Sequence, residues 1–352
     1  MPLFTGAYAN PLASSAHLSM QGALDTTRQA LSLAGAPNVD NLAMTVVALT
    51  GFERTLNHPW AALRQHEVHY AASMVKIAAM YAAFDLRSSA DQLAIARGLT
   101  TWAQIEAALV STFNPEIDVH TPGPIASSPT LGPHDKRRKP SYSALLQRGS
   151  GPDFIVDFTR AQWAAFEDMM VQQHNAGAGV TIHALGYPYL DGKLTDDGFF
   201  DGVSNGIWLA GDYVQQWPYA RIACVNDRDT AQGTTTWQLA SLLTLLADDQ
   251  LVGPLSSRGM KDLMARAGTF FHSTSPPIWP VGGRFTATHG KVGIGPLKSG
   301  RTVFSESTIV TDNLRDISFV AVWQNVIQGA QTQRQLLEPV ATLVEAAING
   351  CV

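Results

Sequence analysis

A hydroxyl and an amine stand three residues apart in Ser73-Met74-Val75-Lys76, which opens the pattern SMVKIAAMYAAFDLR over residues 73–87. Apolar residues at 74, 77, 78, 81 and 84 predict a helix over this segment. Side chains three positions apart share a helix face, so Ser73 and Lys76 can hydrogen-bond there. A serine becomes a nucleophile when a base takes its proton, and a lysine can be that base when burial or another cation lowers its pKa. The spacing therefore predicts a serine nucleophile with a lysine base.

A second segment with possible chemistry lies near the end of the chain, in His289-Gly290-Lys291-Val292-Gly293-Ile294-Gly295. A lysine on a strand that is followed by glycines allows a substrate backbone to approach the strand edge. A solvent-facing lysine before a turn is the alternative interpretation of the same residues.

The pattern of elements around these segments predicts the fold class. An apolar, β-branched run over 42–49 predicts an early buried strand, and later runs over 284–290, 303–310 and 317–325 predict three more. Helical patterns occupy 21–34, 91–99, 102–113, 159–171, 178–185, 234–248, 257–267 and 333–348, while 186–233 is rich in turn residues. This order predicts an α+β fold, an α/β sandwich whose antiparallel sheet is formed by both chain ends, with an all-helical part inserted between them.

Three regions follow from this order: an N-terminal arm over 1–20, an α/β subdomain from 21–70 with 250–352, and a helical subdomain over 71–249. Within the helical subdomain, residues 114–153 contain many Pro, Gly and Ser residues and are too long for an ordinary connection. We expect this segment to be an insertion or a lid near the mouth of the site.

Composition limits the possible partners. The 352 residues carry a formal net charge of -5, so nucleic-acid binding is not expected, and the basic run over 136–139 is interpreted as a solvated loop. We expect no membrane span, because no apolar run approaches 18 residues, and no cofactor or metal, because no dinucleotide, phosphate-loop or zinc motif occurs. A small-molecule or peptide-like substrate is the expected partner; the oligomeric state stays open. No signal peptide is visible, which predicts a cytoplasmic location, or a periplasmic one if a leader has been removed.

Together, the S-x-x-K motif on an early helix and a K-[ST]-G variant on a late strand resemble the penicillin-recognising serine enzymes, closest in layout to the class A β-lactamases. Arg228-Asp229-Thr230 and the helix that follows resemble the end of that family's Ω loop and its next helix. The resemblance covers about two-thirds of the chain.

The resemblance implies roles for the residues of both motifs. Ser73 would attack a carbonyl carbon and form an acyl-enzyme, with Lys76 as general base assisted by the like charge of Lys291. The backbone N–H groups of Ser73 and Ile294 would form the oxyanion hole.

The family's middle motif, S-x-N, is placed at Gln173-His174-Asn175. Asn175 would then hold the substrate amide and Lys76. Substrate contacts are also expected from the other motif positions, Gln173, His174, Val292 and Gly293. An alternative placement at Ser204-Asn205-Gly206 keeps a serine but lies too close to Arg228.

Three departures from the family pattern argue against efficient β-lactam hydrolysis. Gln173 replaces the serine that passes a proton to the leaving nitrogen, and His174 is either its substitute or a structural residue. No glutamate occurs between Glu167 and Glu306 to activate the deacylating water; Asp212 is the nearest acidic residue, although a surface-turn role is favoured for it. Val292 replaces the serine or threonine of the K-[ST]-G motif, which removes one hydrogen-bond donor to a substrate carboxylate.

The sequence therefore predicts a serine hydrolase that acts on an amide or ester, with poor or no β-lactamase activity. Two alternatives remain: an inactive binding or scaffold protein, and a genuine β-lactamase or D-alanyl peptidase. Aromatic residues over 187–219 either pack this turn-rich segment or line an apolar acyl pocket.

Overall fold

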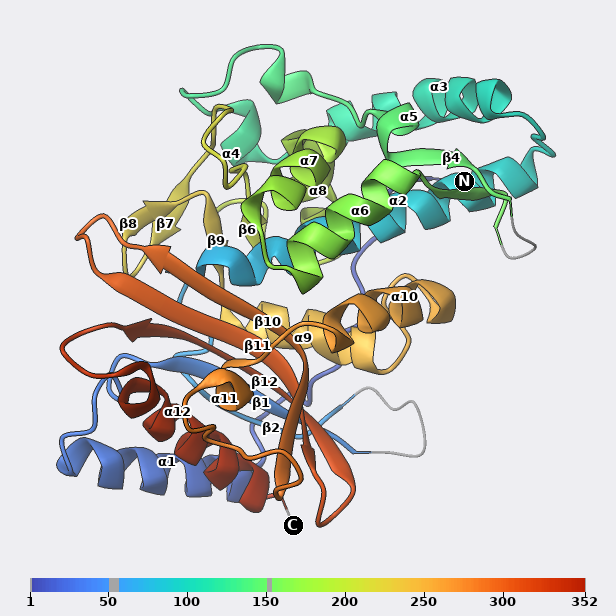
Figure 1. Ribbon diagram of the computed structural model, residues 1–352. Coiled ribbons are helices and arrows are strands. Elements are labelled where there is room, and N and C mark those ends of the chain that lie inside the picture. The colour runs from blue at the N-terminus through green and yellow to red at the C-terminus, as the bar shows by residue number, and fades with distance from the viewer. Residues whose placement is uncertain (1, 51–56, 151–153, 352) are drawn as a thin grey trace.

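The computed structural model describes residues 2–50, 57–150 and 154–351. Its centre is a five-stranded antiparallel sheet with the strand order β10-β11-β12-β1-β2. Figure 1 shows the early strands, in blue, beside the late ones, in orange and red. The strands are β1 (Ala43–Leu49), β2 (Trp60–Leu63), β10 (Phe285–Pro296), β11 (Thr302–Asp312) and β12 (Ile317–Ile327). The predicted fold class is confirmed, and both chain ends contribute to the sheet.

Helices cover both faces of this sheet, which explains why every residue of β1 except Thr45 is apolar. Side chains alternate along the strand: Val46 packs toward α1 (Leu18–Leu33) and α12 (Gln333–Asn349), whereas Val47 packs toward α9 (Thr236–Ala247). The sheet is therefore the middle layer between two hydrophobic cores.

The inserted helical part is built around the long helix α2 (Lys76–Ala96), of which almost every residue before Ala90 is buried. Its other helices are α3 (Trp102–His120), α4 (Gly123–Ala126), α5 (Tyr142–Leu145), α6 (Arg160–Phe166), α7 (Asn175–Leu185) and α8 (Tyr187–Asp196), with a π-helical turn over Glu167–Val171. Figure 1 places them on the side of α9 and α10 (Pro254–Ala265), away from α1 and α12. α11 (Phe270–Ser273) lies against α12 and β10.

Short strands complete the structure between these parts. β3 (His69–Tyr70), β9 (Gln232–Thr234) and β6 (Trp208–Leu209) form a three-stranded sheet beside the start of α2. Two hairpins, β4 (Leu146–Arg148) with β5 (Val156–Phe158) and β7 (Ile222–Cys224) with β8 (Arg228–Thr230), lie at the periphery.

Several predicted boundaries are wrong. The helices predicted over 73–87 and 91–99 are one helix, α2, because Ser88 and Ser89 do not interrupt its packing. α3 continues through Pro115 to His120, into the segment predicted as a loop-rich insertion. The final three residues of that insertion, 151–153, lie outside the described residues.

The largest omission is α8, which lies inside the region predicted to be turn-rich. Its Pro188 occupies the first turn, where a proline needs no N–H partner. Gly192 interrupts the helical pattern of the sequence. A side chain is excluded there, because a Cβ would lie 2.8 Å from the carbonyl oxygen of His120. Tight packing against α3 thus explains a glycine that looks like a turn signal.

No helix of the described ranges is both long enough and apolar enough to cross a membrane. Cys224 and Cys351 are not bridged to each other.

Candidate active site

Ser73 lies in a 3-10 turn, Ala72–Val75, that leads directly into α2. Ala72 has a φ of 49°, a left-handed conformation that is unfavourable for a residue with a side chain. Hydrogen bonds hold the turn on both sides: Ser305 Oγ donates to the Ala71 carbonyl at 2.7 Å, and Tyr213 Oη donates to the Ala72 carbonyl at 3.0 Å. A strained, over-determined backbone of this kind is typical of functional sites.

Lys76 follows at the first residue of α2, with 0 % of its surface exposed. Its Nζ donates three hydrogen bonds, to the carbonyls of Gln173 (3.4 Å) and His174 (2.9 Å) and to Asn175 Oδ1 (2.8 Å). The same Nζ lies 4.8 Å from the centre of the Tyr213 ring. Burial lowers the pKa of Lys76 to about 8, although the charge of Asp168 acts in the opposite direction.

Lys291 reaches the same region from the edge strand β10 and is also 0 % exposed. Residues 291 and 293 lie on one face of the strand. A Cβ on Gly293 would lie 2.3 Å from the Ala71 carbonyl oxygen and 3.0 Å from Met74 N. The strand therefore packs directly on the turn that carries Ser73, and glycine is required for this approach.

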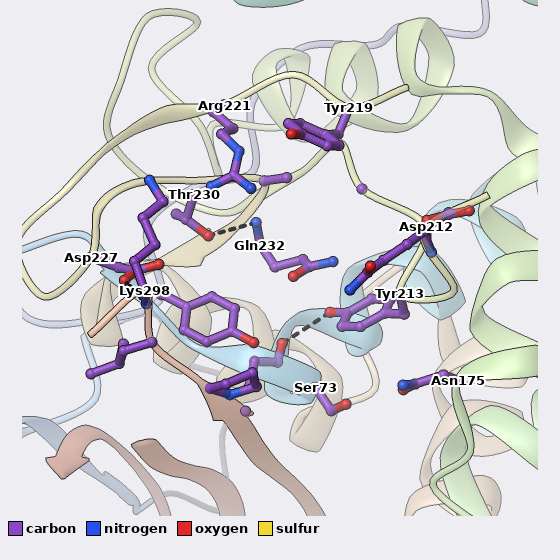
Figure 2. A pocket seen from close by; sticks show the side chains of 18 of the residues that line it. Ser73, Asn175, Asp212, Tyr213, Tyr219, Arg221, Asp227, Thr230, Gln232 and Lys298 are labelled. Carbon is purple, nitrogen blue, oxygen red and sulfur yellow. Dashed lines mark hydrogen bonds between the residues drawn. The ribbon is translucent and has the colours of Figure 1, made fainter. Parts of the chain in front are cut away.

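The segment Gln173-His174-Asn175 lies at the start of α7. Gln173 has a φ of 64°, and its carbonyl points at Lys76. His174 Nδ1 lies 2.7 Å from Asp168 Oδ1 and its side chain is 65 % exposed, so an acidic neighbour fixes the imidazole. Asn175 lines the pocket beside Ser73, as Figure 2 shows.

The remaining predicted residues of β10, Val292 and Ile294, lie on the strand face opposite to Lys291 and Gly293. Ile294 is 52 % exposed and lines the pocket. Val292 packs against the core under α11 and α12, on the opposite face from Lys291. Ser204 and Asn205 lie in a turn whose N–H groups bind Asp201, and they are not among the pocket-lining residues.

A pocket of about 670 Å³ opens beside Ser73. One wall consists of aromatic and amide side chains, of which Tyr70, Gln215 and Gln232 were not considered in the sequence: Tyr70, Tyr213, Gln215, Trp217, Tyr219 and Gln232. Of the aromatic residues considered in the sequence, Tyr213, Trp217 and Tyr219 line this pocket, whereas Tyr189, Phe199, Phe200 and Trp208 are buried in the core. Both interpretations of that aromatic segment thus apply, to different residues.

Asp212 occupies a turn but is not a surface residue, because only 3 % of it is exposed. Its carboxylate accepts the N–H groups of Gln215 and Gln216 and lies 3.3 Å from His183 Nε2. The expectation of a surface turn is wrong for a physical reason: the carboxylate organises the left-handed residues Tyr213 and Gln215 and is buried beneath them.

Charges at the pocket rim are paired with one another. Asp229 Oδ1 lies 2.7 Å from Lys298 Nζ and 3.0 Å from Arg221 Nη1, and Asp227 accepts the backbone N–H of Lys298 at 2.6 Å. These contacts join the β7–β8 hairpin to the β10–β11 turn. The rim therefore combines two cations and two carboxylates.

The predicted insertion supports this wall from behind. Arg138 lies 4.5 Å from the centre of the Trp217 ring, and Thr130 donates a hydrogen bond to the carbonyl of Tyr219. No described residue of the insertion lines the pocket. Elsewhere too, the described part of the chain contains no group of three His, Cys, Asp or Glu side chains that could bind a metal ion.

Comparisons with known proteins show a likeness of structure. No protein-family model matches the sequence, and no curated protein matches it. A class A β-lactamase from Bacteroides cellulosilyticus is similar over 94 % of this chain and 98 % of its own, with 12 % identity and a TM-score of 0.56. A β-lactamase from Burkholderia phymatum is similar over 94 % and 99 %, with 12 % identity and a TM-score of 0.53. A β-lactamase from Chitinophaga pinensis is similar over 91 % of this chain and 97 % of its own, with 12 % identity and a TM-score of 0.53. The chain therefore has the fold of the class A β-lactamases.

Proposed function

We propose that this protein is a serine acyl-transfer enzyme, a hydrolase of amides or esters, in which Ser73 forms an acyl-enzyme and a buried lysine amine accepts its proton. The observation that carries the proposal is the position of Ser73: it lies at a pocket wall on a strained turn, with the buried amines of Lys76 and Lys291 approaching from α2 and β10. Among the described residues neither amine has a carboxylate at ion-pair distance, and two such buried amines are costly to retain for stability alone.

The proposed oxyanion hole uses the backbone N–H groups of Ser73 and Ile294. Both residues line the pocket, and Gly293 brings β10 against the turn that bears Ser73. In acylation, Ser73 Oγ loses its proton to the amine and bonds to the substrate carbonyl carbon. The bond to the leaving group then breaks, and the leaving group takes up a proton.

Deacylation is expected to be slow. The pocket contains two carboxylates, Asp212 and Asp227, among its described lining residues, and both are occupied by backbone N–H groups. Tyr213 covers Lys76 on the side of this wall, and a phenol is no base near neutral pH, since burial raises its pKa well above the usual value. We therefore expect a long-lived acyl-enzyme and slow or absent turnover of β-lactams.

The pocket composition favours a bulky, uncharged acyl group. Its rim charges are mutually paired, while the amides of Gln215 and Gln232 form no side-chain hydrogen bond within the described residues. These amides are free to bind a polar, neutral ligand such as a peptide-like chain.

The test is intact-mass labelling with a fluorophosphonate and with a penicillin, in wild type, Ser73→Ala and Ser204→Ala. Ser204 is an exposed serine outside the pocket, so its variant is a matched control that also tests the alternative motif placement. We expect an adduct in wild type and Ser204→Ala and none in Ser73→Ala. Absence of any adduct in the folded wild type would favour an inactive binding or scaffold protein. Rapid nitrocefin turnover that Ser73→Ala abolishes would indicate a genuine β-lactamase.

A further inference from the structure

Lys76 and Lys291 are both fully buried, yet their Nζ atoms have very different surroundings. Lys76 Nζ has three acceptors, two carbonyls and the Asn175 amide oxygen, and lies against the face of the Tyr213 ring. Lys291 Nζ has one acceptor among the described residues, the carbonyl of the adjacent Val292 at 3.3 Å. The two amines thus differ in how many N–H groups their surroundings can satisfy.

The number of N–H groups on an amine depends on its charge. An ammonium carries three donors and no lone pair, whereas a neutral amine has two donors and one lone pair. Three acceptors around Lys76 match an ammonium, and the electron-rich face of Tyr213 also favours a cation. The single acceptor found near Lys291 Nζ among the described residues is satisfied by a neutral amine, so it does not require an ammonium group.

The charges near Lys291 point the same way. From α2 it faces Lys76, whose charge adds to burial in lowering the pKa of Lys291 well below the usual range. From β11 it faces Ser307, which is neutral. On α10, Lys261 and Asp262 act on His289, two residues earlier on β10. The charge of Asp168 favours the cation at Lys76. Two adjacent buried cations are strongly unfavourable, so we expect one of the pair to be neutral.

We infer that Lys76 is the permanent cation of this pair and that Lys291 holds the free lone pair, which makes Lys291, rather than Lys76, the base for Ser73. The inference rests on the proposed function and reverses the role that the sequence pattern assigns to Lys76. Lys291 shares its strand face with Gly293, which packs on the turn of Ser73, so its side chain points toward that turn.

In the proposed reaction one proton passes from Ser73 to Lys291 and then to the leaving group. The Oγ–H proton of Ser73 moves to the Lys291 lone pair as Oγ bonds to the substrate carbonyl carbon. The resulting Lys291 ammonium returns the proton to the leaving group as its bond to that carbon breaks. Lys76 keeps its proton throughout, and its fixed charge stabilises the developing negative charge.

Arginine substitutions separate a fixed charge from a base, because arginine stays protonated. The measurement is the rate of fluorophosphonate labelling of Ser73 from pH 6 to 10, in wild type, Lys76→Arg and Lys291→Arg, each checked for folding by circular dichroism. We expect Lys76→Arg to stay within about tenfold of wild type and Lys291→Arg to fall by about 100-fold or more. The reverse order, or equal losses in both variants, would overturn the inference.

A second measurement does not depend on activity or on the folding of an arginine variant. Carbon-13 label at lysine Cε reports by NMR the protonation state of each lysine, and Lys291→Gln and Lys76→Gln assign the two signals. We expect the signal absent from Lys291→Gln to be that of a neutral amine at pH 7. If the neutral signal instead disappears in Lys76→Gln, or if both signals are those of ammonium groups, the inference is wrong. A wild type that is never labelled at Ser73 would refute the proposed function, and the NMR result would still decide where the proton lies.

Discussion

Two buried lysine sites in this protein have opposite electrostatics. Lys193, on α8, is 2 % exposed, with Asp197 Oδ1 at 3.0 Å and Asp85 Oδ1 at 3.6 Å from its Nζ. Although burial acts to lower it, these carboxylates raise the pKa of Lys193 to about 12. Burial lowers the pKa of both Lys76 and Lys291. The charge of Lys76 lowers the pKa of Lys291 further, whereas the charge of Asp168 acts to raise that of Lys76.

A buried charge that stabilises a fold has partners of opposite charge, whereas a buried charge that is available for chemistry lacks them. Around Lys193, Asp197 also accepts a hydrogen bond from Tyr81 Oη, and Asp85 accepts one from Tyr189 Oη, so the charges have compensating partners. Within the described residues, neither Lys76 nor Lys291 has a carboxylate at ion-pair distance, although the charge of Asp168 acts on Lys76. Such an arrangement is typical of functional sites with perturbed protonation.

The largest effect should come from breaking the compensated site. Lys193→Met leaves Asp85 and Asp197 buried without their cation, and we expect the free energy of unfolding to fall by about 3–5 kcal/mol. Lys291→Met is the matched control: it removes an amine without a carboxylate partner and should leave stability unchanged or raise it. Urea denaturation checks both, and equal losses in the two variants would contradict the comparison.

Glu306 on β11 is the acidic counterpart of the uncompensated lysines, because it is buried and has no ion pair within the described residues. Burial raises its pKa to about 8, although the N–H of Phe270 binds its Oε1 at 2.8 Å. The folded state therefore binds this proton more tightly than the unfolded state, so stability is present at low pH and is lost as pH rises from about 4.5 to about 8. We expect wild type to lose at most about 3 kcal/mol between pH 5 and 7 relative to Glu306→Gln. Urea denaturation at both pH values measures this, and parallel curves for the two proteins would disprove it.

A smaller effect should follow from Tyr213→Phe, which keeps the ring beside Lys76 and removes the hydrogen bond to the Ala72 carbonyl. We expect a loss of about 1 kcal/mol in stability and a several-fold slower labelling of Ser73, because the turn is held less firmly. The matched control is Tyr187→Phe, since the Tyr187 hydroxyl is buried without a hydrogen-bond partner among the described residues. If both variants behave alike, the Tyr213 hydroxyl does not position Ser73.

The smallest effect is expected at the exposed rim. Lys298→Ala breaks an exposed ion pair with Asp229 and should cost less than about 1 kcal/mol. It leaves the rim with excess negative charge, so we expect labelling by cationic acyl esters to increase relative to neutral ones. Lys136→Ala, outside the pocket, is the control; unchanged selectivity in Lys298→Ala would show that rim charge does not select the acyl group.

The sequence predicts those parts of the fold whose packing is one-sided and periodic. The amphipathic pattern over 333–348 agrees with α12 to within one residue, and the β-branched run over 317–325 with β12 to within two. It also selects Ser73, Asn175 and Ile294, which the fold brings to one pocket although Ile294, on β10, lies far from the other two in sequence.

The pocket wall over 211–232 could not be predicted in the same way. Tyr213 and Gln215 adopt left-handed backbone that the buried carboxylate of Asp212 imposes, and no periodic pattern marks such a turn. The protonation of Lys76 is equally hidden, because it depends on carbonyls of residues 173 and 174, about a hundred positions along the chain.

The sheet topology also sets an order of events during synthesis. Ala43 on β1 lies opposite Gln324 on β12, so β1 must wait for most of the chain before it gains that neighbour. Helical contacts are more local and form earlier. We therefore expect the nascent chain to hold Ser73 without β10, and thus without Lys291, until late in translation. Under the proposed function, Ser73 would thus lack its base, and would be protected from reacting, while the chain is still on the ribosome.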